Sequence, residues 1–343
     1  MRAAFGQQFD MPDGYLNTAS IGMPPVAAAE AVVEAVRDWR AGSGRATDFD
    51  EPVAVARAAF AQLIGVRADR VAIGSSVSAL VGLIAASLPD GARVLVARGE
   101  FSSVTLPFTI RADRGITVTE ADLAELPAKV GEADLVAVSV VQSADGALLD
   151  LAALRAEAAR AGTRVLLDVT QAVGWLPLSL DWADAVVAAG YKWLLCPRGV
   201  AWLAVSDALR DSIVPHSANW YAGADRWNSI YGAAPALAAD ARRLDTSPAW
   251  LCHVGAAAAL PWLASLDRQA VRAHCVALAN QLRVELGGVP AESAITVVHR
   301  PGAAERLGDA GVVVSTRNGV ARLAFHLYNT EADVHRALAA LAR

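Results

Sequence analysis

The sequence predicts an α/β fold, in which a mostly parallel central sheet lies between helices and a smaller α+β domain follows. Between residues 70 and 205, short apolar segments alternate with segments whose apolar residues have helical spacing. Several of the short segments are apolar throughout, which is typical of parallel strands that are buried on both faces. The chain has 343 residues, 55% of them hydrophobic and 19% charged, so a large core is expected.

Two helices are predicted ahead of the alternating region. The first runs from Val26 to Ala41 after two prolines, and the second covers residues 51–65 and ends at Gly65. The alternating region then follows in order. Strands are predicted over 70–75, 93–97, 135–141, 164–170, 184–190 and 200–205, and helices over 78–88 and 151–162.

A long irregular segment, residues 215–235, follows the last of these strands and is rich in Trp, Tyr, Asn and Gly. Irregular segments of this length inside a compact protein are usually functional. The smaller α+β domain is predicted over residues 248–343. It comprises helices over 250–266, 267–286 and 331–342 and strands over 294–300, 311–316 and 320–326.

Composition excludes several classes of function. The net charge of −5 gives no electrostatic reason to expect nucleic acid or an acidic membrane as a partner. The three cysteines form no CxxC pair and the six histidines have no metal-ligand spacing, so no metal site is predicted. The first residues have no apolar leader and no apolar run is long enough to span a membrane, so we expect a soluble cytoplasmic protein.

Lys192 is unusual because it lies in an apolar segment, "VVAAGYKWLLCPRGVAWLAV". The chain has only one other lysine, Lys129, which lies in a polar stretch. Burial lowers the pKa of a lysine amine, since the charged form loses its hydration. Lys192 is therefore either a side chain that reaches water from a strand end or an amine nucleophile that forms a Schiff base.

Polar residues also follow two other predicted strands, and ligands of parallel sheets bind at such strand ends. Ser75, Ser76 and Ser78 open a helix, where they form either a simple N-cap or a phosphate site. Asp168 ends another strand, where a buried carboxylate needs a cationic or hydrogen-bonding partner. Pyridoxal phosphate would use a lysine, a carboxylate and a phosphate cradle together. Neither a GxGxxG after the first strand nor a P-loop is present.

These motifs resemble the class V aminotransferase family of fold type I pyridoxal phosphate enzymes. Asp168 and Lys192 lie 24 residues apart, within "DVTQAVGWLPLSL" and "YKWLLCPRGVAWLAV". The segment "GYLNTASIGMPP" is similar to the family's substrate-side N-terminus, which implies such a segment over 1–25 with Ala19 at the substrate. The segment "RLAFHLYNTEADVHRAL" is similar to its C-terminal signature, which implies that Arg322 binds the substrate α-carboxylate.

The resemblance also implies a large cofactor-binding domain over 26–247, a small domain over 248–343, and a homodimer whose active sites use residues of both subunits. Ala189 stands where many members have a phosphate-binding serine. The remaining cofactor contacts that it implies are Ser75, Ser76, Val77 and Tyr191 at the phosphate, Ser247 at the phosphate of the other subunit, Phe101 on the ring, and Gln171 with Gln142 or Ser143 at the phenolic oxygen.

One departure narrows the chemistry that is expected. Desulfurases of this family have a cysteine on the loop before the carboxylate-binding arginine, and here that loop, "VSTRNGVAR", has none. Cys196, Cys252 and Cys275 lie elsewhere and are interpreted as ordinary core or helix residues. Persulfide-forming desulfuration is therefore not expected. His326 is interpreted as a core residue.

We therefore expect β-elimination from a cysteine S-conjugate, giving a thiol, pyruvate and ammonia, in thiol or secondary-metabolite biosynthesis. Lys192 would move the Cα proton, and Asp168 would keep the cofactor's pyridine nitrogen protonated. Two alternatives use the same residues: an aminotransferase, or a decarboxylation-coupled oxidative deamination. Tyr221 either acts on the substrate or packs as a simple aromatic residue. A binding module without turnover is a further alternative, against which Lys192, Asp168 and Arg322 argue together.

Overall fold

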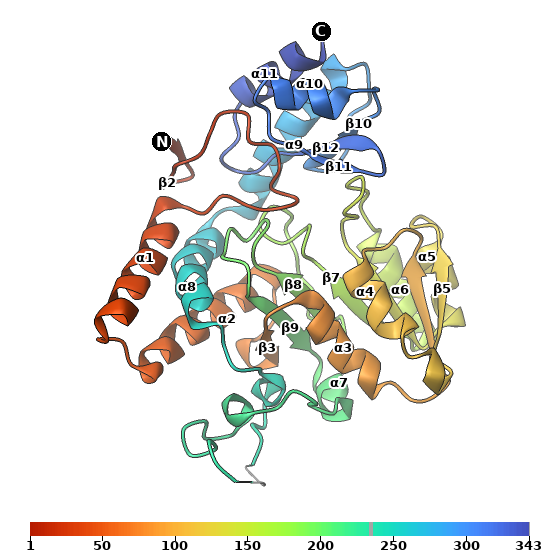
Figure 1. Cartoon of the computed structure of the whole chain (residues 1–343). Helices are drawn as coiled ribbons and strands as arrows, with labels where there is room; N and C mark the ends of the chain where they lie inside the picture. The colour runs from red at the N-terminus through yellow and green to blue at the C-terminus, as the bar shows by residue number, and fades with distance from the viewer. Residues whose placement is uncertain (233–235, 343) are drawn as a thin grey trace.

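The computed structural model describes residues 1–232 and 236–342, and its central feature is a seven-stranded sheet in the order β3-β9-β8-β7-β6-β4-β5 (Figure 1). Four of the neighbouring pairs are parallel, and β9 is antiparallel to both of its neighbours. The mostly parallel sheet predicted from the sequence is thus confirmed. The strands are β3 Val71–Gly74, β4 Arg93–Ala97, β5 Thr117–Ala121, β6 Leu135–Ser139, β7 Arg164–Asp168, β8 Ala185–Ala189 and β9 Ala201–Val205.

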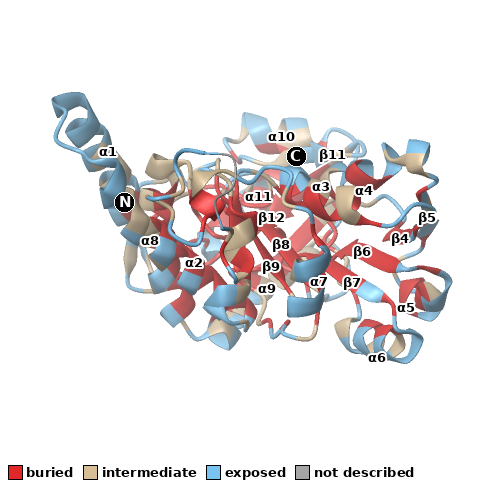
Figure 2. Cartoon of the chain, turned by 90° about the horizontal axis from the view of Figure 1, so that it is seen from below, coloured by how far each residue is buried: buried red, intermediate tan, exposed pale blue. Residues whose placement is uncertain are grey.

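Helices cover both faces of this sheet. Alternate strand residues face opposite sides, so that Val186 packs toward α2, α6 and α8 while Val187 packs toward α3, α4 and α7. Figure 2 shows the resulting buried strands between helices whose outer surfaces are exposed. The helices of this part are α1 Val26–Ala41, α2 Asp50–Ile64, α3 Val77–Ser87, α4 Ser102–Thr109, α5 Leu126–Lys129, α6 Leu151–Ala161, α7 Asp207–Ser212 and α8 Trp250–Ser265.

The C-terminal part forms a second, smaller core around an antiparallel sheet in the order β10-β12-β11. Its elements are α9 Arg268–Glu285, β10 Ile295–Val298, α10 Ala303–Asp309, β11 Ser315–Arg317, β12 Val320–Ala324 and α11 Glu331–Leu341. The preceding helix, α8, packs against α1 and α2 and contributes to the core of the large sheet. The domain boundaries at residues 25 and 247 stay predictions.

The N-terminal segment connects the two parts of the molecule. It begins with a hairpin of β1 Arg2–Ala4 and β2 Gln7–Phe9, and Tyr15 and Asn17 then form bridges to residues of the small domain. A few residues later, the Gly22 N–H donates to the Tyr191 carbonyl, 2.9 Å away. Residues 10–25 therefore pass beside both the small sheet and the loop that carries Lys192.

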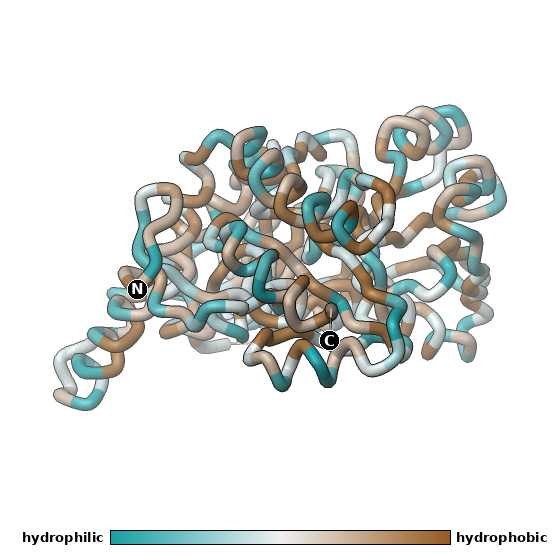
Figure 3. The backbone as a smooth tube through the Cα atoms, turned by 90° about the horizontal axis from the view of Figure 1, so that it is seen from above, coloured by the Kyte–Doolittle hydropathy of each residue, from teal (hydrophilic) through white to brown (hydrophobic). Residues whose placement is uncertain are grey.

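Helix α1 projects at the edge of the molecule, where one side packs against α8 and most of its surface is exposed (Figures 2 and 3). Its only buried residue is Ala28, and Trp39 near its end is 72% exposed. Short 3-10 helices complete the structure: η1 Ala46–Phe49, η2 Ala68–Arg70, η3 Ala112–Arg114, η4 Val130–Glu132, η5 Trp220–Ala222 and η6 Ala241–Leu244. Across residues 1–232 and 236–342, each helix is too short or too polar to cross a lipid bilayer.

Several short elements were not predicted. They include the edge strand β5, the hairpin β1-β2 and helices α4, α5, α7 and α10. In β5, only Ala121 is buried, because polar residues occupy most of this strand at the edge of the sheet. The irregular segment predicted over 215–235 contains the single turn η5 in its described part, and it lies at the opposite end of the molecule from the small domain (Figure 1). Its residues 233–235 lie outside the described ones.

Candidate active site

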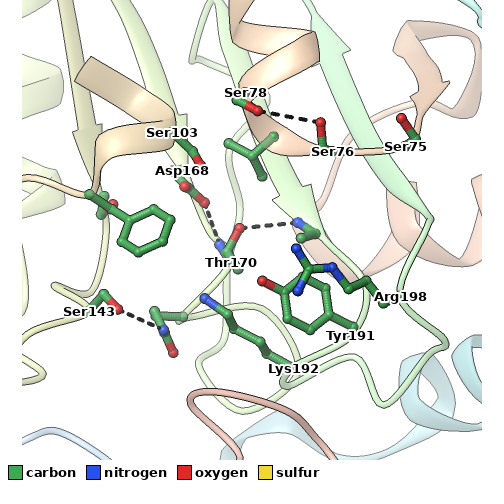
Figure 4. A pocket seen from close by; sticks show the side chains of 15 residues that line it. Ser75, Ser76, Ser78, Ser103, Ser143, Asp168, Thr170, Tyr191, Lys192 and Arg198 are labelled. Atoms are coloured by element: carbon green, nitrogen blue, oxygen red, sulfur yellow. Dashed lines mark hydrogen bonds between the residues drawn. The ribbon is translucent and has the colours of Figure 1, made fainter. Parts of the chain in front are cut away.

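A polar cavity lies where the C-terminal ends of β7 and β8 meet the start of α3 (Figure 4). This is the edge at which parallel α/β sheets collect their ligands. Most of the residues predicted for the cofactor therefore lie together. The cavity is lined by Ser75, Ser76, Val77, Ser78, Phe101, Ser103, Ser139, Ser143, Asp168, Thr170, Gln171, Ala189, Tyr191, Lys192 and Arg198.

Lys192 follows β8 on the connection to β9. Its side chain is buried, and its Nζ lies 5.1 Å from the centroid of the Phe101 ring and 5.6 Å from that of Tyr191. Burial lowers the pKa of the amine to about 8, although the Asp168 carboxylate opposes this shift. With that pKa, roughly one tenth of the amine is neutral at pH 7, so a reactive nucleophile is available.

Asp168 is the last residue of β7 and is buried at the wall of the cavity. Its Oδ1 accepts the Thr170 N–H at 2.7 Å. Burial raises the pKa of the carboxyl to about 6, against the effect of the Thr170 hydrogen bond. Among the described residues, no arginine, lysine or histidine lies within ion-pair distance of it. A buried carboxylate in this state is stabilised by a cationic ligand such as a pyridinium.

The start of α3 forms another wall of the cavity. Ser76 caps the helix by accepting the Ala79 N–H at 3.3 Å, and Ser78 lies two residues further on, in the first turn of α3. The free N–H groups at a helix start and the helix dipole favour an anion there. Ala189 presents only a methyl group at this cavity, while its N–H donates to Thr170 Oγ1.

Arg198 adds a cation that the sequence analysis did not identify. Its guanidinium lies 5.0 Å from the centroid of the Tyr191 ring and lines the same cavity. Its position on the loop of Lys192, six residues further along, is the only sequence signal that could have indicated it. A helix start, serine hydroxyls, Tyr191 and Arg198 together suit a phosphate group. With Lys192 and Asp168, these residues fit pyridoxal phosphate.

Gln171 is held in place by three neighbours. Its Nε2 donates to the Ala19 carbonyl at 2.9 Å and to Ser143 Oγ at 3.2 Å, and its Oε1 accepts the Trp193 indole N–H at 2.7 Å. Ala19 thus contacts the site through its backbone. Gln142, in contrast, does not line the cavity, because its amide donates to Glu100.

Glu100 is a second residue that the sequence analysis missed. Its carboxylate accepts hydrogen bonds from Ser139 N–H and Oγ, at 2.7 and 2.6 Å, and from the Phe101 N–H at 2.7 Å. These bonds join the end of β6 to the turn that carries Phe101. No local pattern reveals this contact, because 39 residues separate Glu100 from Ser139.

Arg322 lies on β12 and is almost completely buried. Its guanidinium donates to the carbonyl and, at 3.1 Å, to the Oγ of Ser143, and to Ser20 Oγ at 2.9 Å and Ser315 Oγ at 3.2 Å. Burial lowers its pKa to about 10, and the charge of Arg317 adds to this effect. No carboxylate of the described residues pairs with it. Arg322 is therefore a buried cation beside the cavity, and the described part of the chain provides it with no anionic partner.

Two further residues predicted for the site, Tyr221 and Ser247, do not line the cavity. The Tyr221 hydroxyl donates to Asp50 Oδ1 at 3.0 Å and accepts from Arg226 at 2.7 Å, and neither the ring nor the hydroxyl lines the cavity. Ser247 is exposed and also lies outside the cavity. The roles predicted for both stay predictions.

The cysteines and His326 also lie away from the cavity. Cys196 and Cys275 are buried, and burial raises the pKa of both thiols. The Cys252 thiol, which is partly exposed, contacts the Arg198 carbonyl. His326 is buried against the Trp193 carbonyl at 2.9 Å, and burial lowers its pKa to about 3.

Comparison with known proteins relates the chain to one family. Residues 30–305 match the family described as Aminotransferase class-V. The uncharacterized aminotransferase YcbU of Bacillus subtilis (strain 168) is 29% identical over 339 residues, with 91% of this chain and 90% of the relative covered. Isopenicillin N epimerase of Streptomyces clavuligerus is 29% identical over 340 residues, with 83% of each chain covered.

Solved structures with the same fold include the cystine C-S lyase C-DES, in complex with its reaction product cysteine persulfide. Its TM-score is 0.85 at 21% identity, with 98% of this chain and 99% of that chain covered. The cysteine desulfurase CsdA of Escherichia coli has a TM-score of 0.81 at 20% identity, with coverages of 98% and 96%.

Proposed function

Because the chain belongs to the class V aminotransferase family and its cofactor is pyridoxal 5′-phosphate, we propose that it is a C–S lyase acting on cysteine S-conjugates. The observation that carries this proposal is the Lys192 amine in one cavity with Asp168, beside the buried Arg322, which has no carboxylate partner among the described residues. The thiol product would serve thiol or secondary-metabolite biosynthesis.

Each part of the cavity would hold one part of the cofactor. Asp168 would bind the pyridine nitrogen, the start of α3 with Tyr191 and Arg198 would bind the phosphate, and Phe101 would cover the ring. When bound, the cofactor withdraws electrons from the substrate Cα and makes its proton acidic. The raised pKa of Asp168 does not prevent this pairing, because a cationic partner favours the charged carboxylate.

Arg322 would bind the substrate α-carboxylate. A guanidinium and a carboxylate form a strong, geometrically specific pair, and the anion would neutralise a buried cation that no carboxylate of the described residues pairs with. Ser20 and Ser143 hold the guanidinium in place for this contact. Ser143 also lines the cavity, so the carboxylate site and the Lys192 amine are adjacent.

Lys192 would then accept the Cα proton, since a pKa of about 8 suits a base that works near neutral pH. In β-elimination the Cα–H and Cβ–S bonds of the substrate break, and the sulfur leaves as a thiolate that takes up a proton. Water hydrolyses the remaining 2-aminoacrylate to pyruvate and ammonia. No cysteine lines the cavity in the described part of the chain, so the support is for elimination rather than persulfide formation on the enzyme.

The test is to incubate the purified protein with S-ethylcysteine and S-carboxymethylcysteine, without a keto acid, and to measure pyruvate and free thiol. We expect equal amounts of both products from at least one substrate. Lys192→Ala should abolish them, whereas the matched variant Lys129→Ala, at a partly exposed lysine outside the cavity, should not. Activity that survives in Lys192→Ala would contradict the assignment, and a wild-type protein without any turnover would favour a binding module.

The second candidate is transamination, or a decarboxylation-coupled oxidative deamination, with the same residues. The similarity over 91% of the chain to a relative named as an aminotransferase favours it. Amine transfer from the substrate to an added keto acid, with no thiol released, would establish this candidate and exclude the lyase.

We also propose a homodimer in which Ser247 reaches the phosphate of the other subunit. The support is that Ser247 is exposed and that α1 extends from the molecule with Val33, Val36 and Trp39 at its surface, 48%, 39% and 72% exposed. Light scattering should give twice the chain mass, and Trp39→Glu should lower both the dimer fraction and the activity. A monomer with full activity would contradict this arrangement.

A further inference from the structure

A second arginine, Arg317, lies beside Arg322 on the same hairpin. Strands β11 and β12 are joined by Asn318 and Gly319, whose φ angles of 48° and 79° are typical of a tight two-residue turn. In this register Arg322 pairs with Ser315, and Arg317 pairs with Val320. Because alternate residues share a face, the side chains of Arg317 and Arg322 project from the same face of the sheet.

Both arginines bind the same serine of the N-terminal segment. Arg322 Nη2 lies 2.9 Å from Ser20 Oγ and Arg317 Nη2 lies 3.2 Å from it, so the two nitrogens are at most about 6 Å apart, the sum of these distances. The other hydrogen bond of Arg317 goes to the neighbouring Thr316 carbonyl at 2.8 Å. Arg317 therefore keeps donors free on a guanidinium that the hairpin and Ser20 hold in place.

Neither arginine has an anionic partner among the described residues. Adjacent like charges repel, and Arg317 follows burial among the causes that lower the pKa of Arg322. The charge of Arg317 also acts on Lys192, where it adds to the effects of burial and Arg322 on the amine pKa. This end of the site thus has two fixed positive charges, and a substrate α-carboxylate supplies one negative charge.

We propose that Arg317 binds a second acid group, carried on the substrate side chain, so that the enzyme selects amino acids with an acidic side chain. This inference rests on the proposed function, because it takes Arg322 as the site of the α-carboxylate. The short distance between the two guanidinium groups indicates acid groups separated by only a few bonds. Among cysteine S-conjugates, those with an acid on the sulfur substituent would be preferred.

The test is isothermal calorimetry of the cofactor-loaded protein with succinate and glutarate, and with butyrate as the matched monocarboxylate. These acids have no amine, so they bind without reacting. Ionic strength is held constant, because salt screens such interactions. We expect at least one dicarboxylate to bind about tenfold more tightly than butyrate, the difference that one added charged contact of about 1.4 kcal/mol would give.

In Arg317→Gln the dicarboxylate affinity should fall to that of butyrate, and the butyrate affinity should stay the same. Arg317→Lys should keep part of the preference, and Arg300→Gln, at an exposed arginine outside the cavity, should keep all of it. Equal wild-type affinities, an equal loss for both kinds of acid in Arg317→Gln, or no measurable binding would overturn the inference. Because calorimetry measures binding and not turnover, its result can be interpreted even if the lyase assay fails.

Discussion

Gly22 touches the backbone of the loop that carries Lys192 so closely that one methyl group should disable the proposed active site. This residue is buried in the N-terminal segment, and its N–H donates to the Tyr191 carbonyl at 2.9 Å. A Cβ added at Gly22 would lie 1.9 Å from the Lys192 carbonyl oxygen and 2.7 Å from Leu195 Cδ2. Leu195 could rotate away, but the carbonyl belongs to the backbone that positions the lysine.

The displacement that Gly22→Ala requires follows from these distances. Real Cβ atoms essentially never approach another heavy atom within 3.0 Å, so the segment and the Lys192 backbone must separate by at least about 1.1 Å, the difference from 1.9 Å. A misplacement of about 1 Å at a catalytic group costs about 100-fold in rate. Overpacking of this kind also destabilises a fold by about 1–3 kcal/mol.

The assay for Gly22→Ala is kcat/KM for pyruvate release, together with the absorbance of the bound cofactor and a urea unfolding curve. The matched control is Gly82→Ala in the interior of α3, where the added Cβ meets no atom within 4 Å. The control should keep its activity and gain slightly in stability, since alanine is a better helix former. Activity of Gly22→Ala within about threefold of wild type, with an unchanged unfolding midpoint, would refute the reasoning.

Three further predictions concern Lys192, Asp168 and a buried ion pair. After removal of the cofactor, the rate of its reattachment should rise about tenfold per pH unit up to about pH 8 and then level off. The reason is that the neutral Lys192 amine is the proposed nucleophile and its lowered pKa is about 8. Stopped-flow absorbance measures this rate, and a rate that does not change with pH would contradict the prediction. Asp168→Asn should keep the fold, since an amide oxygen can accept the Thr170 N–H, but it should lower kcat by about 10²–10³-fold. A decrease in kcat of less than about threefold would exclude a catalytic role for the Asp168 charge. Arg57→Ala should lower the free energy of unfolding by about 3–5 kcal/mol, because it leaves the fully buried Asp245 carboxylate, 2.6 Å from Arg57 Nη2, without this partner. Urea denaturation measures this free energy, and a loss below about 1 kcal/mol would count against the prediction.

The central strands could be predicted because their burial between helices requires apolar residues, which are visible in the sequence. Strand β8 is apolar at every position and β7 is apolar along its centre, as burial on both faces requires. The edge strand β5 has no such pattern, because solvent covers most of it. The antiparallel direction of β9 was not predicted, although one signal was present. The connection from β8, residues 190–200, contains no crossover helix, which a parallel pair usually needs.

The sequence by itself determined the α/β fold class and predicted which residues at the strand ends would line one cavity. Parallel strands place their carboxyl ends at one edge, so Asp168 and Lys192 were expected to meet there with the serines that begin α3. Only the tertiary structure decided which groups surround them. Ser20 lies about 300 residues from Arg322 and Arg317 in the chain, and Glu100 and Ser139 belong to different strand ends. Such contacts depend on how whole elements pack, and side-chain hydrogen bonds across these distances leave no periodic pattern in the sequence.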